Sequence, residues 1–261
     1  MASALLLPAT ARAADPPRGT PLLPGDVVIP GATPAPAATP ADVHLRAISI
    51  VVIDPGHGGD DSGVRAATAT PIAEKDLALE LARRIEALVT SQTGARVLLS
   101  RAADVHLATP DRTSFANEAR ADLFLSIHAN GSPSPSAHGF RVYYHDSSSA
   151  DAGPSAAGPA PALAWPFAQR ESESKSAHFA ELLRESLTTK VSIADRGVKR
   201  VPMSVLEGST CPSVVLEIGF LSNKDEALAL STSAVQDAIA QAVADAIQKM
   251  DAMLAGAEGT P

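Results

Sequence analysis

The stretch Val51-Val52-Ile53-Asp54-Pro55-Gly56-His57-Gly58-Gly59-Asp60 decides the fold. It continues an apolar run from Ile48 to Ile53 that is short and rich in β-branched residues, which is typical of a strand buried on both faces of a parallel sheet. Proline ends the strand, and the glycines allow a tight turn and a close approach to a ligand. His57 is therefore expected at the carboxyl end of a central strand, where open α/β sheets place their sites. Taken alone, His57 is as consistent with a side chain that is hydrogen-bonded within the turn as with a functional residue.

The composition excludes several classes of protein. The chain has 261 residues, of which 45% are hydrophobic, so it is long and apolar enough for one sizeable domain. A net charge of −8 argues against a nucleic-acid binder and against a basic protein of membrane surfaces. No apolar run is long enough to span a bilayer. Because Cys211 is the single cysteine, the chain has no intrachain disulfide and no cysteine-based metal site.

Residues 1–42 are interpreted as a truncated, signal-like segment followed by a linker. The apolar residues Ala4 to Leu7 precede Ala11-Arg12-Ala13, which fits a small-x-small cleavage site, so we expect a periplasmic or otherwise exported protein. The rest of the segment is crowded with Pro, Ala, Gly and Thr and should be extended and flexible. The sequence predicts a folded domain over 43–254 and a frayed C-terminus over 255–261.

The folded domain alternates strands with amphipathic helices. The first helix, beginning near Glu74, places Leu77, Leu81, Ile85 and Leu88 on one face. Further helices are expected to begin near residues 109, 165, 223 and 232. Strands are expected over 48–53, 96–100, 123–127, 139–144, 201–206 and 212–218. This alternation indicates a three-layer α/β domain with a mostly parallel, twisted sheet flanked by helices.

Three of these strands carry or end in a side chain that can bind a metal or transfer a proton, namely His57, His128 and Glu217. A fourth candidate, Glu74, begins the first helix. The carboxyl ends of parallel strands meet at one edge of a sheet, so these side chains can converge. Two imidazoles and one carboxylate are the ligands of many catalytic zinc sites, and a further carboxylate can transfer protons. The alternative for Glu217 is a glutamate at an exposed strand end, bonded to backbone amides.

Four blocks of sequence resemble the zinc-dependent N-acetylmuramoyl-L-alanine amidases, the peptidoglycan amidases of the amidase-3 type. The resemblance extends from about Ser49 to Met250. The blocks are Val52-Ile53-Asp54-Pro55-Gly56-His57-Gly58-Gly59, Glu74-Lys75-Asp76, Ser126-Ile127-His128-Ala129-Asn130 and Leu216-Glu217-Ile218-Gly219-Phe220-Leu221-Ser222-Asn223, with Arg196-Gly197-Val198-Lys199 as a weaker fifth. One departure is the loop from Arg65 to Ala73, where the family usually has a glycine.

The resemblance implies a function and a role for each site residue. It implies that His57, Glu74 and His128 are ligands of a zinc ion (Zn2+) and that Glu217 is the catalytic carboxylate. The implied reaction is hydrolysis of the amide between N-acetylmuramic acid and L-alanine in peptidoglycan, for wall turnover or cell separation. Peptidoglycan is the implied partner, and an activator protein is a further one; nucleic acid and a membrane span are not expected.

Two other functions remain open. One is a zinc carboxypeptidase or endopeptidase acting on the stem peptide, which shares the ligand chemistry but breaks a different bond. The other is a wall-binding module with an inactive centre, against which the retention of all four site residues argues. Two arginines, Arg101 and Arg112, could contact stem-peptide carboxylates, although solvated arginines explain them as well.

The segment 146–176 is interpreted as an insertion bordering the site. Some members of the family carry here a helix that covers the zinc until an activator moves it. Glu171 and Glu173 could occupy the open zinc position, with Trp165 and Phe167 as anchors. A mobile flap or a wall of the substrate groove are the alternatives.

Overall fold

The computed structural model describes residues 47–66, 68, 71–146 and 164–258, with the side chains of 164–171 and 257–258 excepted. The predicted signal-like segment and linker, and most of the predicted insertion, therefore lie outside the described residues. Within the described ranges, no helix combines the length and the apolar character needed to cross a membrane.

One six-stranded sheet forms the centre of the unit His44–Pro261, with the strand order β2-β1-β3-β6-β4-β5. The strands are β1 Ile50–Pro55, β2 Arg96–Leu99, β3 Leu123–Asn130, β4 Phe140–His145, β5 Asp195–Val201 and β6 Ser213–Phe220. All neighbouring pairs are parallel except β4 and β6, which run antiparallel. The prediction of a mostly parallel sheet is confirmed.

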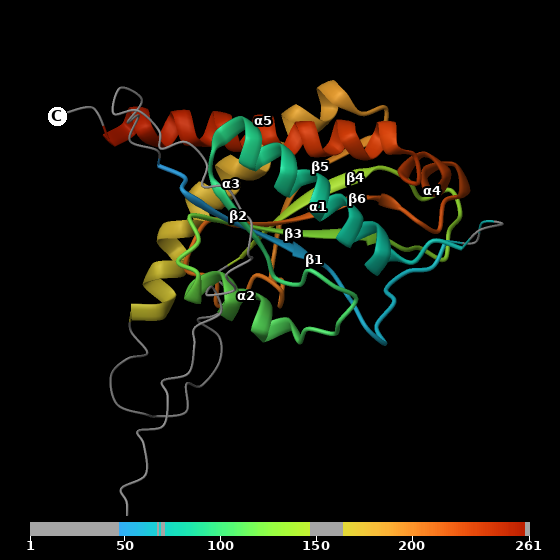
Figure 1. The fold of residues 1–261 in the computed structure, drawn as a ribbon, viewed down its shortest axis with the longest axis horizontal. Helices are drawn as coiled ribbons and strands as arrows, with labels where there is room; N and C mark the ends of the chain where they lie inside the picture. The colour runs from blue at the N-terminus through green and yellow to red at the C-terminus, as the bar shows by residue number, and fades with distance from the viewer. Residues whose placement is uncertain (1–46, 67, 69–70, 147–163, 259–261) are drawn as a thin grey trace, which may run out of the picture. The chain divides into compact units, whose positions relative to one another are not determined.

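Helices cover both faces of this sheet (Figure 1). They are α1 Glu74–Thr93, α2 Thr109–Glu118, α3 Ala164–Lys190, α4 Lys224–Leu230 and α5 Ser233–Glu258. Figure 1 shows α1, α3 and α5 on one face and α2 on the other, which confirms the three-layer α/β arrangement. Helix α5 extends beyond residue 254, since Met253 and Leu254 still pack against the core.

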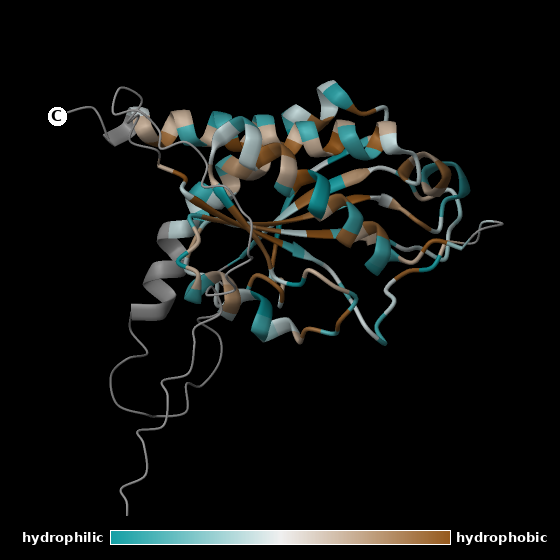
Figure 2. Cartoon of the chain, viewed as in Figure 1, coloured by the Kyte–Doolittle hydropathy of each residue, from teal (hydrophilic) through white to brown (hydrophobic). Residues whose placement is uncertain are grey.

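Two apolar clusters hold the layers together. The larger lies between the sheet and α1, α3 and α5, and the smaller lies under α2 around Val52, Phe124 and Val215. The central strands are accordingly apolar along their length in Figure 2. Successive residues of a strand face opposite sides of the sheet. Residues that lie an even number of positions from Val52, Phe124 or Val215 on the same strand therefore also face the α2 side. These residues include Asp54, Ser126, His128 and Glu217.

The prediction of a strand over 201–206 is wrong. The chain forms β5 earlier, at Asp195–Val201, and residues 204–208 make a turn. β5 is an edge strand, and four of its residues are exposed: Asp195, Arg196, Lys199 and Arg200. Such a strand lacks the apolar run that identifies a central one.

Candidate functional site

The side chains of His57, Glu74 and His128 converge at the carboxyl ends of β1 and β3. The Oε1 atom of Glu74 lies 2.9 Å from Nε2 of His57 and 3.0 Å from Nδ1 of His128. One ligand atom from each residue lies within 4.8 Å of the other two. The predicted convergence of these three residues is therefore present, although His128 lies within β3 and not beyond its end.

The three donor groups fit a zinc ion. Two ligand atoms bound tetrahedrally at zinc–ligand distances of about 2.0–2.1 Å are separated by about 3.4 Å. The separations of 2.9 and 3.0 Å between the glutamate oxygen and the imidazole nitrogens need to open by only a few tenths of an ångström. The imidazole rings meet edge to face, with centroids 5.0 Å apart, so both can present a nitrogen to one point.

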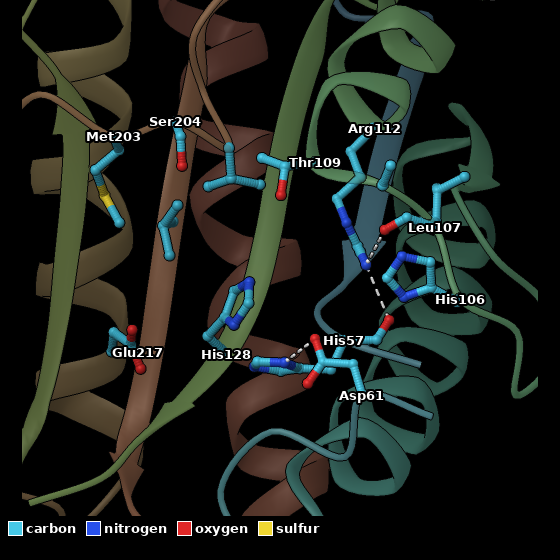
Figure 3. Close-up of a pocket in the computed structure, with 13 residues that line it drawn as sticks. His57, Asp61, His106, Leu107, Thr109, Arg112, His128, Met203, Ser204 and Glu217 are labelled. Carbon is cyan, nitrogen blue, oxygen red and sulfur yellow. Dashed lines mark hydrogen bonds and ion pairs between the residues drawn. The ribbon is translucent and has the colours of Figure 1, made fainter. Parts of the chain in front are cut away.

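His57 is held in a strained loop that follows β1. Its φ of 61° is unusual for a residue with a Cβ, and such strain persists where the surroundings fix it. The Nδ1 atom of His57 lies 2.9 Å from Oδ2 of Asp61, and its carbonyl accepts a hydrogen bond of 2.9 Å from Arg112 (Figure 3). The Asp61 carboxylate thus orients the ring so that Nε2 faces Glu74, as partners of metal-binding histidines do.

Glu74 is buried and held by the backbone on both sides. Its Oε1 atom accepts a hydrogen bond from the Ala129 amide, and its Oε2 atom accepts one from the Val64 amide, both of 2.9 Å. Gly63 leaves the space for this carboxylate, because a Cβ there would overlap Oε2 of Glu74 and lie 2.6 Å from Cδ2 of His57. A glycine is therefore needed at Gly63, just before the loop that begins at Arg65, for the Glu74 carboxylate to fit beside His57.

Burial and ion pairing act in opposite directions on Glu74. Desolvation raises the pKa of this carboxyl, but hydrogen bonds with His128 and His57 outweigh it and lower the pKa to about 2. The same contact raises the pKa of His57, chiefly through its hydrogen bond with Glu74. These hydrogen bonds therefore favour the ionised form of Glu74 and the protonated form of His57.

Glu217 faces the three ligands from the neighbouring strand β6. It is the register partner of His128, and its Oε2 atom is buried with no hydrogen-bond partner among the described residues. Desolvation raises the pKa of this carboxyl to about 7. The alternative of a glutamate bonded to backbone amides is not supported for Oε2. A carboxyl that titrates near neutrality is suited to accept and return a proton.

A pocket of about 490 Å³ opens in front of these groups (Figure 3). Its lining includes His57, His128 and Glu217, the loop residues His106 and Leu107, and Met203 on the opposite side. The pocket is large enough for a sugar or a short peptide beside the metal-binding residues.

Both arginines considered for substrate contacts are instead structural. Arg112 is buried and forms a 2.7 Å ion pair with Asp54, which has no exposed surface. Arg101 is also buried and donates to the carbonyls of Pro55, Gly56 and Lys75. These guanidinium groups hold the back of the loop that carries His57, so the interpretation as solvated side chains is wrong as well.

Sequence reasoning missed Asp61 and Asp54. Asp61 could have been found from its spacing of four residues from His57. Asp54 gave no signal beyond its place in an apolar run.

The glutamates considered for self-inhibition are only partly described. Glu173 forms a 2.7 Å ion pair with Arg200 of β5 and does not line the pocket around His57 and Glu217. The side chains of Glu171, Trp165 and Phe167 lie outside the described residues. The described part of α3 therefore places no carboxylate at the ligands.

Comparison with known proteins identifies the family. The family model described as N-acetylmuramoyl-L-alanine amidase matches residues 51–249. The chain is 33% identical over 195 residues to the N-acetylmuramoyl-L-alanine amidase LytC of Bacillus subtilis, covering 75% of this chain and 34% of LytC. It is 34% identical over 201 residues to the endolysin of Bacillus phage SPP1, covering 77% of this chain and 65% of the endolysin.

A solved structure agrees with the family match. The catalytic domain of CwlV, an N-acetylmuramoyl-L-alanine amidase from Bacillus (Paenibacillus) polymyxa var. colistinus, superimposes with a TM-score of 0.64 at 30% identity. The match covers 77% of this chain and 97% of that domain. The present chain thus spans a third to two thirds of the length of these two curated relatives and nearly all of the solved catalytic domain. Because the family model matches more than half of its length, this chain belongs to the N-acetylmuramoyl-L-alanine amidase family.

Proposed function

We propose that this protein hydrolyses the amide bond between N-acetylmuramic acid and L-alanine in peptidoglycan, using zinc. The observation that carries this proposal is the convergence of His57, Glu74 and His128, with the buried Oε2 of Glu217 facing them from the next strand. Membership of the amidase family supports the choice of bond over a peptide bond farther along the stem.

Each residue has a distinct task in this proposal. His57, His128 and Glu74 would hold the ion, since one ligand atom of each lies close to those of the other two. A zinc ion bound there supplies a Lewis acid that polarises the scissile carbonyl and lowers the pKa of a water molecule to about 7. Asp61 keeps the His57 ring oriented through Nδ1.

Glu217 transfers the proton. Its buried Oε2 atom accepts the proton of the attacking water, and the pKa of about 7 allows the carboxyl to hold this proton at neutral pH. The same oxygen then donates the proton to the nitrogen of L-alanine as the amide breaks. Glu217 lines the pocket, which supports its role as the donor to the leaving nitrogen.

The setting of the reaction follows from the substrate. Because peptidoglycan lies outside the cytoplasmic membrane, the proposal includes export, for which residues 1–42 would carry the signal and the linker to a catalytic domain over 43–254. The named relatives include an N-acetylmuramoyl-L-alanine amidase and a phage endolysin, which supports a wall substrate. An activator protein stays a prediction from the family resemblance.

Digestion of purified peptidoglycan tests this function. The zinc-loaded protein should release free stem peptides whose new amino terminus is L-alanine, identified by mass spectrometry. New termini inside the stem peptide would instead identify a peptidase. Zinc binding without any release would identify a wall-binding module with an inactive centre.

A further inference from the structure

Three positively charged side chains form a strip on β4 and β5 beside the catalytic pocket. We call Arg141, Arg196 and Lys199 the cationic strip. Arg196 and Lys199 are exposed and Arg141 is half-buried. The chain carries a net charge of −8, so a local excess of cations needs a specific explanation.

Two members of the strip, Arg141 and Lys199, lie on the same face of the sheet as Glu217. Arg141 on β4 is the register partner of Glu217 on the antiparallel neighbour β6, and Lys199 on β5 is the partner of Tyr143 on β4. Partners in register share a face, and alternation along β4 puts Arg141 and Tyr143 on the same side. Tyr143 packs against the smaller cluster with Val215, which is in phase with Glu217. Arg141 and Lys199 therefore extend the Glu217 side of the pocket outward over β4 and β5.

No carboxylate among the described residues neutralises these cations. The Arg141 guanidinium lies over the Tyr143 ring and donates from Nε to the Arg196 carbonyl. The Arg196 guanidinium lies 5.0 Å from the centroid of the Phe220 ring and donates to the carbonyl of His138. Lys199 makes no hydrogen bond or ion pair with any residue described.

A neighbouring arginine on the same strand behaves differently. Arg200 follows Lys199 but is in phase with the opposite face, where it forms ion pairs with Asp146 and Glu173 at 2.8 and 2.7 Å. Lys199, which has no partner among the described residues, and the ion-paired Arg200 thus lie on opposite faces of β5. The strip is ready to receive an anion from outside the chain.

The opposite side of the pocket has no free cation among its described residues. It is lined by His106, Leu107, Ala108 and Thr109, and its single arginine, Arg112, is bonded to Asp54 and to backbone carbonyls. Figure 3 shows His106 and Leu107 on one side and Met203 and Glu217 on the other, with His57 and His128 between them. The pocket is therefore electrostatically asymmetric across the metal-binding residues.

We propose that the cationic strip binds a carboxylate of the stem peptide and thereby sets the direction in which the substrate lies. This inference rests on the proposed amidase function. The leaving amine carries the anionic peptide and must meet the proton on Glu217, so the peptide extends from Glu217 over β4 and β5. The uncharged muramoyl sugar then lies against the wall formed by residues 106–109.

Two substrates that differ only in charge test this inference. One is a muramoyl tripeptide with free carboxylates, and the other is the same molecule with every peptide carboxylate converted into a carboxamide. For the zinc-loaded wild-type protein we expect a lower KM for the carboxylate form. Lys199→Ala should raise that KM about tenfold, the loss expected for one charged hydrogen bond, with kcat unchanged. The KM for the carboxamide form should stay the same.

Matched variants separate binding from folding. Arg200→Ala removes a positive charge from the same strand on the other face and should leave the ratio of the two KM values unchanged. Lys199→Arg should restore most of the preference for the carboxylate form. Equal losses on both substrates, or no loss on either, would overturn the inference. The inference would also be overturned if Arg200→Ala abolished the difference between the two KM values as fully as Lys199→Ala does.

A binding measurement keeps this test independent of hydrolysis. Calorimetric titration of the free stem tripeptide should show weaker binding to Lys199→Ala than to the wild type, and no such difference for the carboxamide peptide. If the wild type hydrolyses neither substrate, the proposed function fails, and the titration still decides whether the strip binds the peptide. Equal binding by both proteins would overturn the inference.

Discussion

His128 and Glu217 are register partners on the adjacent parallel strands β3 and β6. Backbone hydrogen bonds in the centre of the sheet fix the separation between an imidazole proposed to bind zinc and the carboxylate that faces it. A site carried on strands is held more accurately than one carried on loops. The relative position of these two groups is therefore set by the sheet itself.

Glu217→Gln should retain zinc and lose turnover. Glutamine preserves the shape of the side chain but cannot accept and return a proton, so hydrolysis should fall by about 10²–10⁴-fold. Zinc content by elemental analysis and release of stem peptides measure the two effects. Glu207→Gln, at an exposed glutamate outside the ligand group, is the control. Loss of zinc from Glu217→Gln would make Glu217 a ligand and refute its catalytic role.

Asp61→Asn should weaken zinc binding by about 10- to 100-fold. The Asp61 carboxylate lies 2.9 Å from Nδ1 of His57 and fixes the ring, and such partners typically contribute this much to metal affinity. Titration against a chromogenic chelator measures the affinity. Asp60→Asn, at the exposed neighbouring position, serves as the control. An unchanged affinity in Asp61→Asn would show that the ring is held without this contact.

Zinc affinity should fall steeply as the pH is lowered. The hydrogen bond with Glu74 raises the pKa of His57 in the metal-free protein, so this imidazole keeps its proton to a pH above 6.5. Zinc must displace that proton, and the apparent affinity should fall about tenfold per pH unit below the raised pKa. Calorimetry in buffers of different ionisation enthalpy would measure the released proton. An affinity independent of pH between about 6 and 8 would contradict this account.

The raised pKa of His57 also makes the free energy of unfolding of the metal-free protein depend on pH. A histidine whose pKa is raised by folding stabilises the fold fully below its unfolded pKa of about 6.5. This contribution is lost as the pH rises through the higher folded value. Urea unfolding of the metal-free protein at several pH values measures this contribution. His57→Gln should remove this part of the pH dependence of the free energy of unfolding.

Arg112→Met should destabilise the fold by about 3–5 kcal/mol, because it leaves the buried Asp54 carboxylate without its cation. Urea denaturation of the metal-free protein measures the change. Arg184→Met removes an arginine from ion pairs at the surface, where a loss of less than about 1 kcal/mol is expected. Similar losses in both variants would show that the buried pair contributes nothing special.

Cys211 should react with thiol reagents only when the protein unfolds. Burial raises the pKa of this thiol to about 11, so the reactive thiolate is scarce at pH 8, and the sulfur is shielded from solvent. Because Cys211 is the single cysteine, the rate of colour release with a disulfide reagent reports this site alone. Rapid labelling of the folded protein at pH 8 would contradict the buried position.

The strands and ligands that the sequence identified share one property. β1, β3 and β6 are buried on both faces, so their apolar runs are uninterrupted and each polar residue within them stands out. His128 and Glu217 were recognisable for this reason, and His57 because it follows the apolar run of β1 in a glycine-rich turn. Glu74 was recognisable because it begins a clear amphipathic helix.

The features that the sequence did not identify depend on tertiary contacts. β5 lies at the sheet edge, where one side lacks a neighbour, so its residues carry no apolar signal. Arg101 and Arg112 resemble any surface arginine until the carbonyls of the loop around His57 are placed beside them. The approach of Gly63 to Glu74 joins two segments by a contact that no local pattern encodes.

The guanidinium groups of Arg101 and Arg112 also determine whether the loop around His57 would depend on the proposed zinc ion for its shape. They hold the carbonyls of Pro55, Gly56 and His57 from within the core, so the loop does not need an ion to keep its shape. The entropic cost of ordering His57 therefore arises during folding and not during metal uptake. Chelation should therefore empty the site without unfolding the domain, unlike a zinc finger. With the proposed zinc-dependent function, the fraction of active molecules should then follow the local supply of the ion, reversibly and without a refolding step.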